Sequence, residues 1–166
     1  MKDLLSTMPP AKKQQDIIVQ IAKNFDGIDD CLPQVEKLVR NICSRFSLSN
    51  ATVSIAIVDD VQIRKLNTQF LKHKTTTDCL SFDLSDDEVP QSPKFFELIV
   101  NGEMALRQAK LRGHSRKAEL ALYITHGLLH NLGFDDATPG KARKMHDTED
   151  EILQQLGYGL VYNKSK

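Results

Sequence analysis

The sequence contains no tryptophan, and aromatic side chains make up only 6% of its 166 residues. A protein that holds single-stranded nucleic acid by extensive base stacking needs many aromatic platforms, so that mode of binding is not indicated. Charge of one sign is also lacking, because 22 lysines and arginines balance 22 aspartates and glutamates. No global field therefore draws the protein to nucleic acid or membrane, although a local basic patch remains compatible with neutrality.

Cysteine is scarce, with only Cys31, Cys43 and Cys79 present and no C-x-x-C spacing between them. An odd number of scattered cysteines argues against a disulfide framework and favours buried thiols in a reducing compartment. The first residues contain no uninterrupted apolar stretch of the kind found in signal peptides, and no run approaches the length of a membrane span. We therefore expect a soluble, cytoplasmic protein without membrane contact.

Alternating strand and helix patterns follow one another along the chain, which is long enough for one domain. Polar residues and a proline pair predict a loose arm over residues 1–15, followed by one domain over residues 16–166. Strands are expected at 16–25, 50–60, 79–84 and 95–101, and helices at 33–46, 60–71, 102–112, 115–133 and 138–156. These patterns predict an α/β (α+β) fold with a mixed sheet of about four strands packed with about five helices.

Four residues mark the expected ends of the last three helices. Gly113 is typical of a helix C-terminus, and Ser115 can cap the next helix. Gly133 is expected to end that long apolar helix, and Thr138 followed by proline begins the last one.

A possible metal site lies in the stretch HGLLHNLGFDD, residues 126–136. His126 and His130 are four residues apart, so on a helix their imidazoles project from the same face. Gly133 would let the chain leave the helix sharply and return a carboxylate from Asp135 or Asp136 to the same point. Two nitrogens and one carboxylate oxygen suit a Zn²⁺ ion with its fourth position open, which is typical of a catalytic site.

Gly127 distinguishes this motif from that of the zinc peptidases. Those enzymes use H-E-x-x-H, in which the glutamate is the general base, whereas Gly127 has no proton-accepting group. A glycine within a helix also costs about 1 kcal/mol relative to alanine, so we expect it to permit close approach of another backbone or of substrate. The alternative is that both histidines are ordinary polar residues of an amphipathic helix.

Through this motif the sequence resembles the YbeY family of metal-dependent endoribonucleases, which act in ribosomal RNA maturation. The family signature H-G-x-L-H-L-x-G-Y-D-H corresponds here to HGLLHNLGFDD. Further segments resemble the family in the same order, from about residue 16 to residue 158: VSIAIVDDVQIRKLN, TTDCLSF, EMALRQAKLRGHS and KMHDTEDEILQQLGY.

The resemblance implies an α/β fold with one Zn²⁺ ion per chain, held in a cleft by three histidines of the motif. His126 and His130 match the first two ligands, and Asp136 stands where the family has its third histidine. An aspartate can still bind zinc, but its charge would make the ion a weaker Lewis acid. Asp135 matches the aspartate before the family's last histidine, so the resemblance favours Asp136 as the ligand. It also suggests Thr77 and Asp78 as supporting groups.

Two further segments depart from the family pattern. Leu71 occupies the place of a family arginine and Thr76 that of a proline, while Phe96 and Glu97 replace a Gly-Asp pair. An arginine at position 71 would suit binding of phosphate or of developing negative charge. The neighbouring cations can supply point charges instead, and these are Lys72, His73 and Lys74.

Basic residues gather in three segments that would serve an RNA backbone if they lined one cleft. The predicted RNA-binding residues are Lys72, Lys74, Arg107, Arg112 and Arg116; Lys110, His114 and Lys117 lie among them, and Lys141, Arg143 and Lys144 form the third segment. Each cluster is equally compatible with a solvated helix face. Binding of single-stranded RNA by its phosphates agrees better with this composition than base readout does.

Three hypotheses remain open at this point. The first is a zinc-dependent endoribonuclease that cleaves single-stranded RNA in ribosomal RNA maturation and ribosome quality control. The second, motivated by Leu71 and Asp136, is a factor that binds RNA or the ribosomal subunit with weakened or lost catalysis. The third is an atypical hydrolase of peptides or small molecules, which rests on the peptidase-like spacing alone.

Overall fold

The computed structural model of the protein describes residues 16–86, 88, 92–159, 161 and 162, so the predicted arm over residues 1–15 lies outside it. Within this part of the chain the structure is a single four-stranded mixed sheet with five α-helices and one short 3₁₀ helix, which confirms the predicted fold class. The strands are β1 (Asp16–Lys23), β2 (Asn50–Val58), β3 (Cys79–Asp83) and β4 (Lys94–Asn101). The helices are η1 (Asp29–Cys31), α2 (Val35–Arg45), α3 (Asp60–Leu71), α4 (Gly102–Arg112), α5 (Arg116–Asn131) and α6 (Pro139–Gln155).

The strand order in the sheet is β1-β2-β4-β3. β1 pairs with β2 and β2 with β4 in parallel, whereas β3 runs antiparallel to β4 at the edge. The register places Ile55 of β2 opposite Ile21 of β1 and Leu98 of β4. Because all three parallel strands end at the same edge, the segments that leave β2 and β4 meet there, which is where open α/β sheets commonly place their sites.

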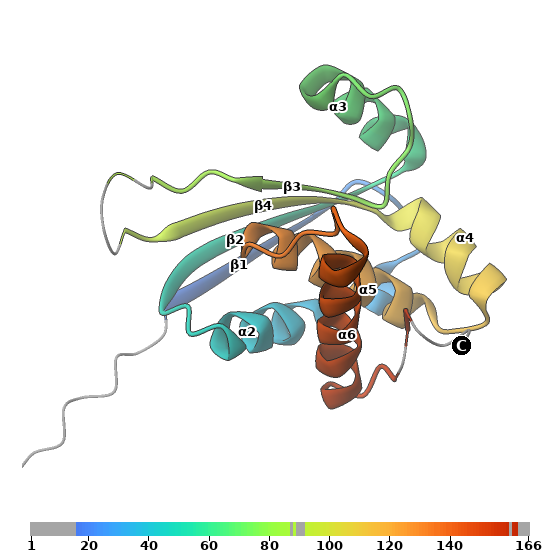
Figure 1. Ribbon diagram of the computed structural model, residues 1–166. Helices are drawn as coiled ribbons and strands as arrows, with labels where there is room; N and C mark the ends of the chain where they lie inside the picture. Colours follow the sequence, from blue (N-terminus) through green and yellow to red (C-terminus); the bar gives the residue numbers. More distant parts are fainter. Residues whose placement is uncertain (1–15, 87, 89–91, 160, 163–166) are drawn as a thin grey trace, which may run out of the picture.

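Helices cover the two faces of the sheet unequally, as Figure 1 shows. α2, α5 and α6 lie on one face, and α3 lies alone on the other. α5 is the central element, since it contacts β3, β4, α2, α4 and α6. Its apolar side chains, among them Leu120, Ile124, Leu128 and Leu129, are almost completely buried. The histidine motif is therefore carried by the most deeply embedded helix of the fold.

The predicted helix ends are confirmed. The Ser115 hydroxyl accepts a hydrogen bond from the Ala118 amide at 3.1 Å, and Thr138 caps α6 through the Lys141 amide at 3.2 Å. Gly113 and Gly133 follow α4 and α5 with φ of +70° and +98°, a region that favours glycine because it has no Cβ.

Gly127 faces the sheet, and its neighbours there explain the missing side chain. A Cβ at this position would lie 2.6 Å from the Cys79 Sγ atom and 3.1 Å from the Leu98 Cδ2 atom. The expectation that a backbone or the substrate approaches Gly127 was therefore wrong, because side chains of β3 and β4 fill the space. The same contacts leave no room for the glutamate of a zinc peptidase.

No helix among the described residues is both long and apolar enough to cross a bilayer.

Substituting Gly127 with alanine tests this close packing. Overpacking of a core costs about 1–3 kcal/mol, which outweighs the gain of at most about 1 kcal/mol in helix propensity. We expect Gly127→Ala to lower the free energy of unfolding, measured by urea denaturation of metal-free protein. Gly140→Ala, where the added Cβ meets nothing within 4 Å, is the matched control and should leave stability unchanged or slightly higher.

Adding Cys79→Ala to Gly127→Ala should recover part of the loss, because it removes the Sγ atom that the new methyl group meets. A Gly127→Ala protein as stable as the wild type would contradict the packing explanation.

Candidate metal centre and its pocket

His126 and His130 bring their ring nitrogens together on one face of α5, as the spacing predicts. The two Nε2 atoms are 3.1 Å apart, and the rings meet edge to face. Two nitrogens that bind the same tetrahedral zinc ion at its usual distance lie about 3.3 Å apart. The distance between the two Nε2 atoms is thus close to that expected for two nitrogens that share one ion.

The opposite nitrogen of each ring has a hydrogen-bond acceptor. His126 Nδ1 lies 2.7 Å from the Glu149 Oε1 atom, and His130 Nδ1 lies 3.1 Å from the carbonyl oxygen of Phe134. Since these oxygens can only accept, each neutral ring carries its proton on Nδ1 and presents an Nε2 lone pair. Two lone pairs that face each other at this distance favour a cation between them, so the donor set is suited to a metal ion.

Asp136, and not Asp135, lies with the two histidines. The side chains of His126, His130 and Asp136 offer ligand atoms that all lie within 4.8 Å of one another. Asp135 is engaged elsewhere, because its Oδ1 atom accepts from the Ala137 amide at 3.1 Å and its Oδ2 atom pairs with Lys141. The bond from Ala137, together with Lys141 and His130, lowers the pKa of Asp135. The geometry therefore supports Asp136 as the predicted third ligand.

Glu149, on α6, is completely buried and holds two imidazoles at once. Its Oε1 atom accepts from His126, and its Oε2 atom lies 3.1 Å from the Nδ1 atom of His146. Burial alone would lower the pKa of His126, but the bond to Glu149 and the charges of Glu149, Asp78 and Asp136 raise it above its usual value. These carboxylates thus stabilise positive charge at the ring, whether it comes from a proton or from a metal ion.

His126, His146 and Glu149 also form a cluster close enough to hold an ion. An ion there would have to replace the Nδ1 protons that form the two hydrogen bonds to Glu149. That would remove the interaction that orients His126 toward His130. We therefore interpret this cluster as the support of the metal centre, in the manner of carboxylate–histidine–zinc arrangements.

A hollow of about 340 Å³ opens beside His126. Its wall combines residues of the loop before β3, of α4, of α5, of α6 and of the chain after α6: Thr76, Thr77, Asp78, Met104, Gln108, Arg112, Glu119, Leu122, Tyr123, His126, His146, Glu149 and Tyr162. The predicted supporting residues Thr77 and Asp78 are part of this wall. The residues missed by sequence reasoning are Glu149, His146 and Tyr162, which are distant in sequence from the motif and belong to no local pattern.

Asn101 fixes the loop that carries Thr77 and Asp78. The side chain is fully buried at the end of β4 and caps α4 by accepting from the Met104 amide at 3.0 Å. Its amide nitrogen donates to the Asp60 Oδ1 atom at 2.7 Å and to the Thr77 carbonyl at 3.2 Å. One amide group therefore joins the starts of α3 and α4 to the loop that lines the hollow beside His126.

The three arginines predicted to bind RNA all have carboxylate partners. Arg107 pairs with Asp60, and Arg116 pairs with Asp30 at 2.7 Å. Arg112 pairs at 3.1 Å with Glu119, a completely buried residue that also contacts His114. Arg112 therefore neutralises a buried charge in the wall of the hollow. RNA binding by these arginines, and by the exposed Lys72 and Lys74, stays a prediction.

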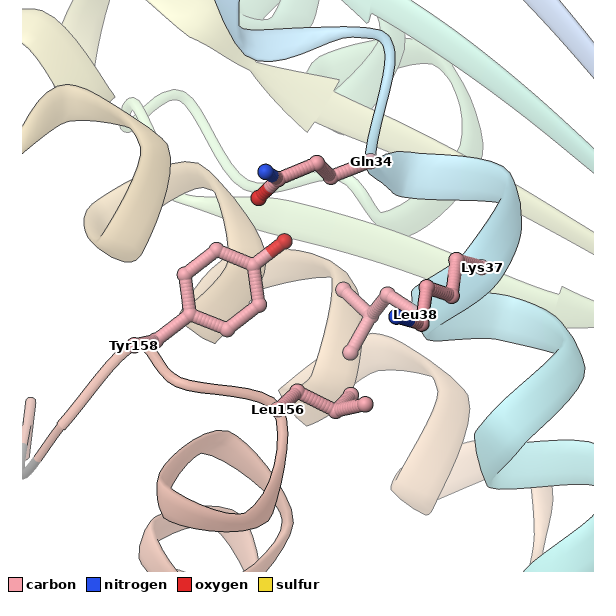
Figure 2. Close-up of a pocket in the computed structure, with 5 residues that line it drawn as sticks. All are labelled: Gln34, Lys37, Leu38, Leu156 and Tyr158. Atoms are coloured by element: carbon pink, nitrogen blue, oxygen red, sulfur yellow. The ribbon is translucent and has the colours of Figure 1, made fainter.

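A smaller hollow of about 140 Å³ lies between the start of α2 and the chain after α6 (Figure 2). Its wall is formed by Gln34, Lys37, Leu38, Leu156 and Tyr158. None of these is a histidine, cysteine or carboxylate, so this hollow has no set of ligands for a metal ion.

Comparison with known proteins agrees with the fold and the motif. A sequence model of the family described as Endoribonuclease YbeY matches residues 18–157. The chain belongs to the YbeY family. The solution structure of a protein from Thermotoga maritima is similar with a TM-score of 0.55 at 21% identity, covering 90% of this chain and 99% of that one, and this likeness concerns the fold.

Three relatives named Endoribonuclease YbeY show how far the likeness extends. The protein of Finegoldia magna is 32% identical over 146 residues, which cover 85% of this chain and 95% of that protein. The protein of Aquifex aeolicus is 30% identical over 155 residues, covering 92% and 100%. The protein of Myxococcus xanthus is also 30% identical over 155 residues, but this chain spans only about half of it, 52%.

Replacing each aspartate in turn separates the metal ligand from its neighbour. We expect Asp136→Ala to weaken zinc binding by at least about tenfold, since even residues behind the ligands contribute that much. Asp135→Ala should retain the affinity for zinc and instead lose stability, because it removes the bond to the Ala137 amide. Isothermal titration with Zn²⁺ measures both variants, and the reverse order of affinities would identify Asp135 as the ligand.

Glu149→Gln tests the support of His126. The amide keeps the shape of the side chain but removes the charge that holds the Nδ1 proton, so zinc affinity should fall about 10- to 100-fold. Glu151→Gln, on the same helix, is the control because that side chain lies at the surface and pairs with Arg45 at 2.9 Å. Equal zinc affinities for the two variants would contradict the role of Glu149.

Proposed function

We propose that this protein is a zinc-dependent endoribonuclease that cleaves single-stranded RNA. In this proposal His126, His130 and Asp136 hold one Zn²⁺ ion per chain, and the substrate is ribosomal RNA during maturation and quality control of the ribosome in the cytoplasm. The single observation that carries it is the pair of Nε2 atoms 3.1 Å apart, on two rings whose Nδ1 atoms each lie within hydrogen-bond distance of an oxygen. The names of the relatives supply the reaction class.

The bound ion would act as a Lewis acid toward a phosphoryl oxygen or an attacking water. The protein contributes the position of that ion and the shape of the adjoining hollow. Glu149 and the Phe134 carbonyl fix the orientation and the tautomer of the two histidines. Because the ligands are held before substrate arrives, little reorganisation is needed when charge develops on the phosphate.

The hollow beside His126 is where the chain of the RNA would enter. Its wall carries the hydroxyl group of Thr76, which accepts from Arg64 and can donate its proton to a phosphate or ribose oxygen. The neighbouring Thr77 hydroxyl donates to Asp78. Lys72 and Lys74 are exposed in the loop that leads to these threonines, so they can follow the flanking phosphates as point charges.

The second candidate function is a factor that binds RNA or the ribosomal subunit with weakened catalysis. It is favoured by Leu71, which is exposed at the end of α3 where the resemblance expects an arginine, and by the negative charge of Asp136 at the metal centre. Both features would reduce stabilisation of a developing phosphate charge. Binding in this case would not depend on the metal ligands.

Cleavage by the wild type beside His130→Ala decides between the two functions. Zinc-reconstituted protein and the variant, prepared identically, are incubated with end-labelled single-stranded RNA, and the products are resolved by gel electrophoresis. We expect the wild type to cleave and His130→Ala to lose both zinc and cleavage, because only one ring nitrogen and one carboxylate remain. Full activity in His130→Ala would overturn the proposed active site.

RNA binding is measured in the same samples by fluorescence anisotropy. If neither protein cleaves but both bind RNA equally well, with unchanged thermal unfolding, the binding factor is the correct function. The variants that remove positive charge are Lys72→Ala and Lys74→Ala. Arg112 is unsuitable for this purpose, because its loss would take a partner from the buried Glu119 carboxylate and destabilise the fold.

A further inference from the structure

Tyr162 lies at the end of the described chain and stacks on a residue of the metal centre's support. Its ring is parallel to the imidazole of His146, with an interplanar angle of 7° and a centroid separation of 3.5 Å. Both rings line the hollow beside His126. The protein thus has a flat aromatic group at one side of the proposed cleavage site.

The exposed surface of Tyr162 is available to a ligand. The residue is 40% exposed although one face of its ring is covered by His146. Because one face of the ring lies against His146, a ligand would meet the ring at its opposite face or at its edges. Tyrosine combines a large apolar ring with a polar hydroxyl group, which is why it is enriched at binding interfaces.

The chain holds Tyr162 in place by several specific contacts. Its amide donates to the Asp150 Oδ1 atom at 3.1 Å, and the neighbouring Val161 side chain is almost fully buried. Arg112 donates through Nη2 to the carbonyl of Val161 at 3.0 Å and to that of Tyr162 at 3.4 Å. A ring fixed in this way can bind a ligand without the entropy cost of first being ordered.

One buried carboxylate connects the ring to the metal ligand. Glu149 holds His126 through one oxygen and His146 through the other, and His146 in turn supports Tyr162. The rings of His126 and His146 are nearly parallel, with centroids 6.2 Å apart. A planar group stacked on Tyr162 would therefore lie at the wall of the hollow that reaches His126.

We infer that Tyr162, backed by His146, is a stacking platform for a nucleobase of single-stranded RNA, beside the phosphate bound at the metal centre. The inference rests on the proposed function, and adds to it the recognition of a base next to the cleaved bond. Every base can stack on an aromatic ring because each has a flat π-face. The platform would therefore position the RNA without selecting its sequence. One such platform is compatible with the low aromatic content, which argues only against extensive stacking.

Binding of two oligomers that differ only in their bases tests the platform. The ligands are a 2′-O-methyl oligoadenylate pentamer and an abasic pentamer with the same backbone, each carrying a fluorescent label and checked for intactness after the assay. Zinc-reconstituted wild type should bind the pentamer with bases more tightly. Tyr162→Ala should weaken binding of that pentamer by about tenfold, the amount typical of one lost stack, and leave binding of the abasic pentamer unchanged.

Two further variants separate stacking from a structural role. Tyr162→Phe keeps the ring and should bind as the wild type does, whereas Tyr162→Leu keeps apolar cover over His146 without a ring and should bind as Tyr162→Ala does. Thermal unfolding and zinc titration of each variant show whether the fold and the metal centre are intact. If Tyr162→Ala does not fold, comparing the binding of Tyr162→Leu with that of Tyr162→Phe still shows whether the ring is required.

The inference is overturned if the variants without a ring bind both pentamers as the wild type does, or if they lose affinity for both equally. It is also overturned if the wild type binds neither pentamer or does not prefer the one with bases. Cleavage of unmodified RNA is measured separately. A wild type that does not cleave but shows ring-dependent binding would overturn the proposed nuclease and leave the base platform standing.

Discussion

The contact between α5 and the sheet at Gly127 is the constraint on which the rest of the site depends. Without a Cβ at this position, the Cys79 and Leu98 side chains press directly against the helix backbone. This packing fixes both the depth and the rotation of α5 relative to β3 and β4. Because a helix is rigid over such a short distance, His126 and His130 are then placed together at the edge of the core and on the side of α6.

The buried carboxylate of Glu149 is the second constraint, because it contacts His126 and His146 and orients their rings. An ionised group with no exposure is costly unless its oxygens are satisfied, and here both oxygens accept from imidazoles. The arrangement fixes the ring orientation of His126 and the place of His146. A similar solution appears elsewhere in the wall of the hollow, where buried Glu119 is satisfied by Arg112 and His114. Both carboxylates thus hold basic side chains in the wall of the same hollow.

Much of the fold could be predicted because its signals are local. Apolar periodicity identified each strand and each α-helix, although not the short 3₁₀ helix η1. Ser115, Gly113 and Thr138 marked helix ends through short-range hydrogen bonds and backbone preferences. The pairing of His126 with His130 was equally predictable, since it follows from the pitch of one helix. The basic clusters were less informative, because sequence does not show that Arg107, Arg112 and Arg116 each face a carboxylate from another part of the chain.

The sequence by itself determined the secondary structure, the class of fold and the two histidines that share a face of α5. Only the tertiary structure decided that Asp136 lies with these histidines, that Gly127 accommodates Cys79, and that Glu149 and Tyr162 join the site. The physical reason is the range of the interactions. Helical pitch, caps and turns act over a few residues, whereas the site is closed by contacts between α5, α6 and the chain after α6, whose relative placement is fixed by packing of the whole core.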